Sequence, residues 1–273
     1  MFYKKIKPRQ ELTFYIECYY IWEGHNENQI PLKVESPPNA FTSIVFNYGD
    51  DYFVSTIKSG PLKVPRQFIV GQNTHSYTLQ LPGKIAMAGI VFRPTGIAAI
   101  LHVPMFALTD ERIDLSVFIP SKVVETTAAK INNAVDAEQK VKLLEDFIYD
   151  FYLKNEPVPD VIDNAANIIV EKHGRVNINE LCSQLFISRR HFERKFLQKV
   201  GLSAKYYARL RRIGYICLQM AGKKDVNWSD LYYEGDFCDQ SHFIKDFTEF
   251  TGRSPSEYLA KNKELIHLLN KDD

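Results

Sequence analysis

The chain has 273 residues, enough for two domains of ordinary size, and 45% of them are hydrophobic, so a sizeable core can form. Its 34 lysines and arginines nearly balance its 33 aspartates and glutamates, and the net charge of +1 excludes a uniformly basic or acidic protein. It has no signal peptide and no long apolar run, so we expect a cytoplasmic protein without a membrane partner.

Residues 1 to about 110 are predicted to be rich in β-strands. Short apolar and aromatic runs alternate there with Pro, Gly, Asn and Asp turn signals, a pattern typical of a small barrel or sandwich. The runs are Phe14 to Trp22, Ser43 to Tyr48, Tyr52 to Ile57, Gln67 to Val70, Tyr77 to Leu81 and Ile85 to Phe92. Their aromatic side chains could line a pocket, but alternating aromatics in strands more often form plain core.

The following segment is predicted to be helical, with a short helix from Ile97 to Leu101 and a longer stretch from about Ser121 to Leu153. In the longer stretch, apolar residues recur at helical spacing at Val141, Leu144, Phe147, Ile148 and Phe151. Such a stripe forms either a dimer seam or the packing of a helix on its own strands, and we favour the packing.

A domain boundary is expected at Glu156-Pro157-Val158-Pro159-Asp160, because two prolines two residues apart favour an extended linker. Asp160 can cap a helix that begins at Val161. We therefore expect a β-rich domain that ends in helices (1–155), a linker (156–160), a helical domain (161–262) and a C-terminal tail (263–273).

The helical domain contains a repeat in which matching positions lie 51 residues apart. The first copy is Ser188, His191, Phe192, Arg194, Phe196, Gly201, Ser203 and Tyr207, and the second is Asp239, His242, Phe243, Lys245, Phe247, Gly252, Ser254 and Tyr258. Ser188 and Asp239 are N-cap residues, and Gly201 and Gly252 are helix stops. The repeat predicts helices over about 189–200 and 240–251, with a joining helix from Ser203 to about Met220.

A shorter helix is predicted ahead of each copy, because Asn177 with Glu180 and Asn227 with Asp230 resemble capping boxes. Two helices joined by a few residues form a helix-turn-helix unit, whose second helix enters the DNA major groove. If the repeated phenylalanines point inward, the opposite faces carry the candidate base-reading residues: Arg190, Glu193, Arg194, Gln240, Ser241, Ile244 and Lys245. Glu193 could accept a hydrogen bond from cytosine or could hold the neighbouring arginines in place.

Positive charge is concentrated on the first unit and the joining helix. From Arg175 to Arg212 there are ten basic residues and two acidic ones, a charge of +8. This concentration favours phosphate contacts, and the candidates for them are Arg189, Lys199, Lys205, Arg209 and Arg212.

The stretch from about Val161 to Lys261 resembles the DNA-binding domain of AraC/XylS transcription regulators. The most specific part of this resemblance is the segment from Asp239 to Phe247 followed by Thr251-Gly252-Arg253-Ser254-Pro255. The resemblance implies an α+β protein in which two recognition helices enter adjacent major-groove segments on one face of the duplex. The N-terminal region more loosely resembles the β-barrel sensor half of such regulators, which implies ligand sensing or dimerisation.

The second unit departs from the family pattern, since Gly235-Asp236 stands where Ala-Gly is usual. Asp tolerates the left-handed backbone region, so we expect the turn to be preserved. The second unit is also less basic, with Asp236, Asp239 and Asp246 near Lys245, and we expect the first unit to supply more of the affinity.

We therefore expect a sequence-specific transcription regulator in which one chain recognises a non-palindromic DNA site. Its expected partners are double-stranded DNA, a small-molecule effector or a second copy of the chain, and RNA polymerase if it is an activator. No catalytic residue, cofactor or metal is expected, because His25, His75 and His102 are widely spaced and the four cysteines have no Cys-x-x-Cys spacing. Two alternatives remain: a cupin-like barrel enzyme fused to a DNA-targeting module, and a regulator whose N-terminal half binds only a protein partner.

Overall fold

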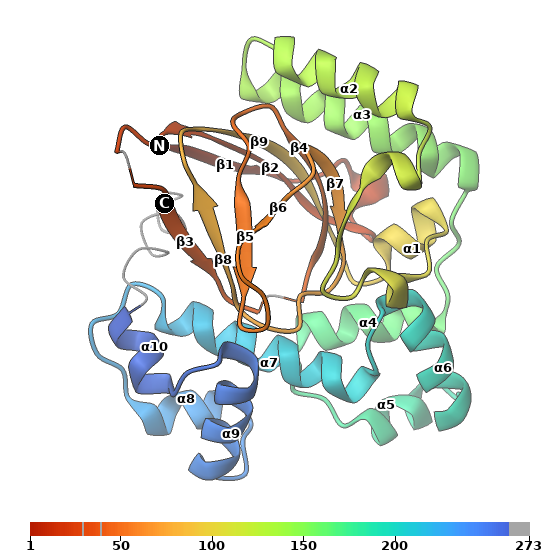
Figure 1. The fold of residues 1–273 in the computed structure, drawn as a ribbon. Coiled ribbons are helices and arrows are strands. Elements are labelled where there is room, and N and C mark those ends of the chain that lie inside the picture. Colours follow the sequence, from red (N-terminus) through yellow and green to blue (C-terminus); the bar gives the residue numbers. More distant parts are fainter. Residues whose placement is uncertain (29, 39, 262–273) are drawn as a thin grey trace.

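The computed structural model describes residues 1–28, 30–38 and 40–261, and the expected tail, 263–273, lies outside them. The described chain forms two antiparallel sheets followed by a group of helices, so the predicted α+β class is confirmed (Figure 1). The two sheets are not joined by a strand ladder in the described residues. Of the predicted barrel or sandwich, the structure therefore has the open, sandwich-like form.

The larger sheet has the strand order β1-β2-β9-β4-β7-β10, and the smaller has the order β3-β8-β5-β6. The larger sheet consists of β1 (Phe2–Ile6), β2 (Ile16–His25), β4 (Thr42–Asn47), β7 (Gln67–Val70), β9 (Lys84–Phe92) and β10 (Arg112–Asp114). The smaller sheet consists of β3 (Leu32–Ser36), β5 (Phe53–Thr56), β6 (Leu62–Lys63) and β8 (Tyr77–Leu81). All six predicted runs form strands, and the described structure adds β1, β3, β6 and β10, which were not predicted.

The larger sheet has buried side chains on both of its faces. Successive side chains of a strand point to opposite faces of a sheet, so neighbouring residues of one strand can enter different cores. On β7, Phe68 and Val70 lie in the core between the two sheets, whereas Ile69 lies in the core under the helices. Trp22 and Phe46 were candidates for lining a pocket, but both are buried in a core. Trp22 lies in the core between the two sheets, and Phe46 lies in the core under the helices. Alternate residues of the larger sheet's strands therefore belong to two different cores, one on each face of the sheet.

Three helices follow the strands: α1 (Gly96–Leu101), α2 (Ser121–Asn133) and α3 (Ala137–Asn155). The predicted long helical stretch is thus a hairpin of α2 and α3, and Asp136 caps the start of α3 by accepting a hydrogen bond from the Gln139 N–H. Four residues of the predicted stripe, Val141, Leu144, Phe147 and Ile148, are buried in the same core as Phe46. The favoured interpretation, packing on the chain's own strands, is confirmed for this face of α3.

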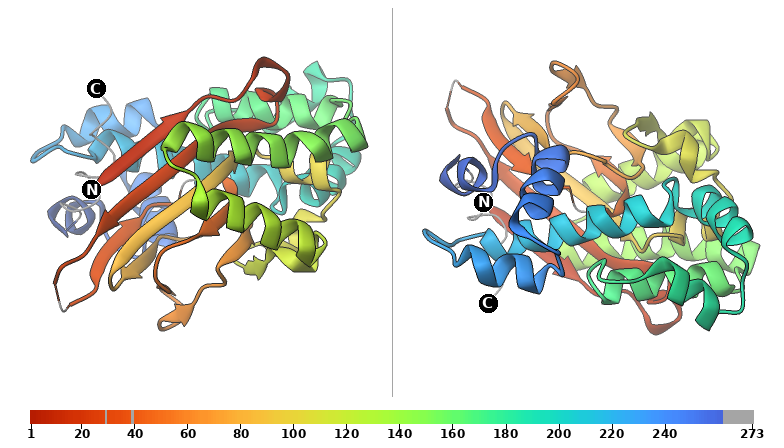
Figure 2. Two further views of the ribbon diagram at one scale, coloured as in Figure 1. Left: turned by 90° about the horizontal axis from the view of Figure 1, so that it is seen from above. Right: turned by 90° about the horizontal axis from the view of Figure 1, so that it is seen from below.

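The remaining helices are α4 (Val161–Glu171), α5 (Ile178–Gln184), α6 (Arg189–Val200), α7 (Ala204–Met220), α8 (Trp228–Glu234), α9 (Gln240–Thr251) and α10 (Pro255–Lys261). Their apolar faces share one continuous core, which also includes Ala40 from the strand region. From below, α7 runs between the pair α5–α6 and the pair α8–α9 (Figure 2). None of the helices in the described residues is long and apolar enough to cross a membrane.

The helical part packs closely against one end of the sheets (Figure 1). The Tyr207 hydroxyl on α7 donates a hydrogen bond to the Ala40 carbonyl over 3.0 Å, and the Asn167 amide on α4 donates to the Phe14 carbonyl over 3.3 Å. Segment 156–160 connects α3 to α4, and we retain it as the proposed domain boundary. Hydrogen bonds between residues that precede this segment and residues that follow it hold the helical part against the strands.

Candidate nucleic-acid interface

The two helices predicted to read DNA, α6 and α9, begin and end at the residues that the repeat predicts. The Ser188 hydroxyl and the Asp239 carboxylate accept hydrogen bonds from the N–H groups of the third helical residues, His191 and His242, over 3.4 and 2.8 Å. Gly201 and Gly252 end the two helices with φ of +89° and +74°, the left-handed region that only glycine adopts without strain. The helix bounds, 189–200 and 240–251, are therefore confirmed.

The turns inside the two units differ in length and in their left-handed residue. Asp236 has a φ of +53°, as expected for this departure from the family pattern, and Phe186 occupies the same position of the first turn with a φ of +52°. The second turn has one more residue than the first, because Cys238 is added before the N-cap. The Phe186 side chain is 98% exposed, so its unfavourable backbone conformation is not offset by burial.

The proposed reading faces point away from the protein core. On α6, Phe192 and Phe196 are fully buried while Arg190 and Arg194 are exposed. On α9, Phe243 and Phe247 are likewise buried, and the exposed residues are Gln240, Ser241, Ile244 and Lys245. Within the described residues, the side chains of Arg190 and Lys245 have no ion-pair partner, so both remain available to a ligand.

Glu193 is already occupied by protein groups. Its carboxylate accepts hydrogen bonds from Arg189 at 3.0 Å and from the Ala204 N–H at the start of α7 at 3.3 Å. Glu193 therefore ties α6 to α7 and fixes Arg189, which also donates a hydrogen bond to the Asn179 side chain on α5. The arginine held by Glu193 is Arg189 and not the expected Arg190 or Arg194.

Lys199 connects α6 to α4. Its ammonium lies 2.9 Å from Asp160 and 2.8 Å from Asp163, and the Asp163 side chain is only 1% exposed. Burial tends to raise the pKa of Asp160, but hydrogen bonds from Lys199 and from the Asp163 backbone outweigh it and lower this pKa. The charge of Lys199 is thus compensated inside the protein.

Arg209 connects α7 to the second recognition helix. Its guanidinium contacts Asp246 at 2.8 and 3.1 Å and Glu249 at 2.6 Å. The hydrogen bond to Asp246 is the main reason that the pKa of Arg209 is raised. Because Asp246 is buried, this pair anchors α9 on α7.

Arg212 supports the turn of the second unit. It donates hydrogen bonds to the carbonyls of Asp236 at 3.1 Å and Gly174 at 3.4 Å, and its guanidinium lies 5.2 Å from the Phe237 ring centre. Burial lowers the pKa of Arg212. Of the five expected phosphate-contact residues, Lys205 is the one that is exposed and without an ion-pair partner in the described residues.

The N-terminal half holds both recognition helices at their glycine ends. A Cβ atom on Gly201 would lie 2.6 Å from the Met105 carbonyl oxygen, and the Thr109 hydroxyl donates a hydrogen bond to the Gly201 carbonyl over 3.0 Å. A Cβ atom on Gly252 would lie 2.7 Å from the Ile57 side chain. The two repeated glycines therefore end the helices, and because they have no side chain they also allow the N-terminal half to approach closely. The sequence pattern does not reveal this second role.

Two polar contacts strengthen the hold on the second unit. The Ser76 N–H donates a hydrogen bond to the Phe250 carbonyl over 3.0 Å, and Arg253 forms an ion pair with Glu35 on β3. These residues lie more than 170 positions apart in the chain, and only the folded structure brings them together.

Comparison with known families agrees with this geometry. Residues 181–261 match a family model described as a helix-turn-helix domain, and residues 4–114 match a domain of unknown function, DUF6597. The chain thus carries a helix-turn-helix domain, in agreement with the resemblance of its helical part to AraC-type regulators. None of the curated proteins compared with the chain matches it.

Several solved structures are similar to the chain at low identity. ToxT from Vibrio cholerae is 12% identical with a TM-score of 0.48, and the match covers 88% of this chain and 97% of ToxT. A second ToxT structure, with bound unsaturated fatty acid, is 14% identical with a TM-score of 0.45 and coverages of 88% and 94%. The AraC-like activator CuxR is 13% identical with a TM-score of 0.28 and coverages of 86% and 99%. At these TM-scores the likeness carries no argument about what this chain binds.

Proposed function

We propose that α6 and α9 read two adjacent major-groove segments of one DNA site. The observation that carries the proposal is the pair of helix-turn-helix units whose polar faces are exposed on the side opposite their buried phenylalanines. The 17-residue helix α7 is about 26 Å long at about 1.5 Å per residue, which is within reach of the roughly 34 Å between successive major grooves.

The exposed side chains suggest which bases each helix reads. Arg190 and Arg194 suit guanine, Gln240 suits adenine, and Ile244 can contact a thymine methyl group, with each good pair worth roughly 1–3 kcal/mol of discrimination. Ser241 and Lys245 complete the face of α9. We assign Glu193 the role of holding Arg189 rather than that of reading a base, because both of its oxygens have protein partners.

Phosphate contacts are assigned to Lys205, which is exposed and has no ion-pair partner in the described residues, and to Arg189, which is paired with Glu193 but is still exposed. The other three expected residues, Lys199, Arg209 and Arg212, are held by protein groups and serve as anchors of the helices. Since α6 exposes three arginines and α9 one lysine, we propose that the first unit supplies more of the affinity.

We further propose that the N-terminal half controls DNA binding through its hold on the two glycine ends. The contacts at Gly201 and Gly252 lie at the ends of the recognition helices and leave the reading faces exposed. A small effector or a second copy that shifts the sheets would therefore change how the two helices are oriented, without having to cover or uncover them.

The DNA-binding part of the proposal is tested by selecting bound duplexes from a random pool with the full-length protein. We expect a non-palindromic consensus and an affinity that falls steeply with salt. Arg194→Ala should weaken binding more than Lys245→Ala, and Lys142→Ala, an exposed lysine on α3, serves as the charge control. A palindromic consensus, or losses in the two reading-face variants no larger than in the control, would refute the proposal.

A further inference from the structure

Phe186 lies in the turn between α5 and α6, at a position whose backbone favours glycine. The Phe186 N–H donates a hydrogen bond to the Ser183 carbonyl over 3.2 Å, and the Ile187 N–H donates one to the Cys182 carbonyl over 3.1 Å. This pair of hydrogen bonds closes the end of α5 and holds Phe186 in the left-handed region, with a φ of +52°. The second unit has the same pair, with Asp236 at the left-handed position. The turn therefore imposes a strained conformation on any non-glycine residue at this position.

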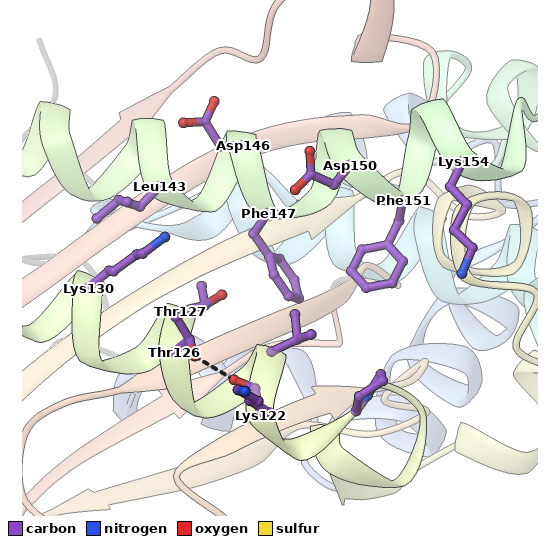
Figure 3. Close-up of a pocket in the computed structure, with 12 residues that line it drawn as sticks. Lys122, Thr126, Thr127, Lys130, Leu143, Asp146, Phe147, Asp150, Phe151 and Lys154 are labelled. Atoms are coloured by element: carbon purple, nitrogen blue, oxygen red, sulfur yellow. Dashed lines mark hydrogen bonds between the residues drawn. The ribbon is translucent and has the colours of Figure 1, made fainter.

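The Phe186 side chain has no packing in the protein that would offset this strain. It is 98% exposed, so its ring packs on none of the described residues. The aromatic side chains of the groove between α2 and α3 show the usual situation, since the rings of Phe147 and Phe151 lie 5.5 Å apart there (Figure 3). The Phe147 ring also contacts Phe46 in the core, at 5.4 Å between ring centres. A residue that strains the backbone and packs on nothing indicates a contact with another molecule.

The surroundings of Phe186 suit DNA better than an apolar protein surface. Its exposed neighbours in the chain are all polar or basic: Ser183, Gln184, Ser188, Arg189 and Arg190. An apolar protein partner would need a wider apolar patch, whereas a DNA groove presents single methyl groups between charged phosphates. Phe186 also precedes the N-cap of α6 by two residues, and the N-terminal residues of a recognition helix are those that contact base edges.

We propose that Phe186 is a further specificity-determining residue, whose ring contacts the C5-methyl group of a thymine at the edge of the segment that α6 reads. Phenylalanine is among the side chains that make apolar contacts with this methyl group. The inference rests on the proposed reading of DNA by α6. The left-handed backbone then has a function, because it holds the ring clear of the protein at the end of the helix that enters the groove.

The contact is tested with full-length protein and the duplex that the binding selection yields. The positions read by α6 are those whose base preference Arg194→Ala alters. Each thymine at or next to these positions is replaced singly by deoxyuridine, which lacks only the methyl group. We expect the wild type to bind one of these duplexes about fourfold more weakly, the factor that burial of about one methyl group contributes. Phe186→Gly should bind the thymine duplex about fourfold more weakly than the wild type and should not distinguish it from the deoxyuridine duplex.

Two further variants serve as controls. Phe186→Tyr keeps the ring and should retain the preference for thymine over deoxyuridine. Phe2→Ala removes an exposed phenylalanine from β1, an edge strand of the larger sheet, and should bind both duplexes like the wild type. Because glycine relieves the left-handed strain, Phe186→Gly should melt no lower than the wild type, so that its weaker binding is not due to unfolding.

Two results would overturn the inference: a wild type that distinguishes thymine from deoxyuridine at none of these positions, and a Phe186→Gly protein that keeps the wild-type preference. If DNA binding by Phe186→Gly is wholly unchanged, the ring belongs to a contact with a protein partner instead. Arg194→Ala separates the two proposals. Weaker binding by Arg194→Ala beside an unchanged Phe186→Gly means that only this inference fails, whereas unchanged binding by both variants means that the reading of DNA by α6 fails as well.

Discussion

Replacing Arg209 by methionine removes the guanidinium that lies between α7 and the second recognition helix. The Asp246 side chain is 4% exposed, whereas Glu249 is 38% exposed. The exposed pair with Glu249 contributes at most about 1 kcal/mol. Stranding the buried Asp246 carboxylate costs about 3–5 kcal/mol, and local relaxation offsets part of it. We expect Arg209→Met to lower the free energy of unfolding by about 3 kcal/mol.

Chemical denaturation of the full-length protein measures this loss. Arg190→Met removes an exposed guanidinium from the first unit and should change stability by no more than about 0.5 kcal/mol. Combining Arg209→Met with Asp246→Leu removes both charges, and it should restore at least half of the lost stability because no buried charge is left unpaired. A loss below about 0.5 kcal/mol in Arg209→Met would show that the pair behaves as a surface ion pair.

The same variant separates an anchoring role from a phosphate contact. If Arg209 anchors α9, the base positions read by α9 should lose their preference in a binding selection while those read by α6 keep theirs. A phosphate contact would instead weaken all sequences equally and reduce the salt dependence. Uniform weakening would therefore contradict the anchoring role.

Three further predictions concern the ends of the two recognition helices and the turn between α5 and α6. The pKa of Asp160 is lowered in the folded protein, so its contribution to stability is present above the unfolded pKa of about 3.9 and is lost as the pH falls below that value. Lys199→Met removes a group that lowers this pKa, and it should therefore reduce the loss of stability at acidic pH when the free energy of unfolding is measured over a pH series. Gly201→Ala should destabilise more than Gly252→Ala, since its Cβ meets a backbone carbonyl rather than a flexible side-chain end, and equal melting shifts would show that the Met105 carbonyl does not restrict this position. Phe186→Gly should stabilise the protein by about 1 kcal/mol by relieving a left-handed conformation, and a fall in melting temperature would show that the exposed ring has a stabilising contact.

Local signals in the chain were sufficient for the helical domain. Capping residues, helix-stop glycines and phenylalanines four residues apart act within a few residues of each other, so the bounds of α6 and α9 and the directions of their faces follow from the sequence. The strands were harder to predict. Runs such as Gln67 to Val70 were recognised by their apolar content, whereas β3 and β10 are held by pairing with β8 and β7, partners that are distant in the chain.

In the candidate site, too, some features follow from local sequence signals and others depend on contacts between distant segments. The sequence determined which residues are exposed on each recognition helix, because helical periodicity and the buried phenylalanines decide that locally. Only the tertiary structure decided which charges are free to meet DNA: Lys199, Arg209 and Arg212 have partners 24 to 40 residues away, and periodicity says nothing about such pairs. The second use of Gly201 and Gly252, as the points where the strand domain holds both helices, likewise depends on contacts between segments far apart in the chain.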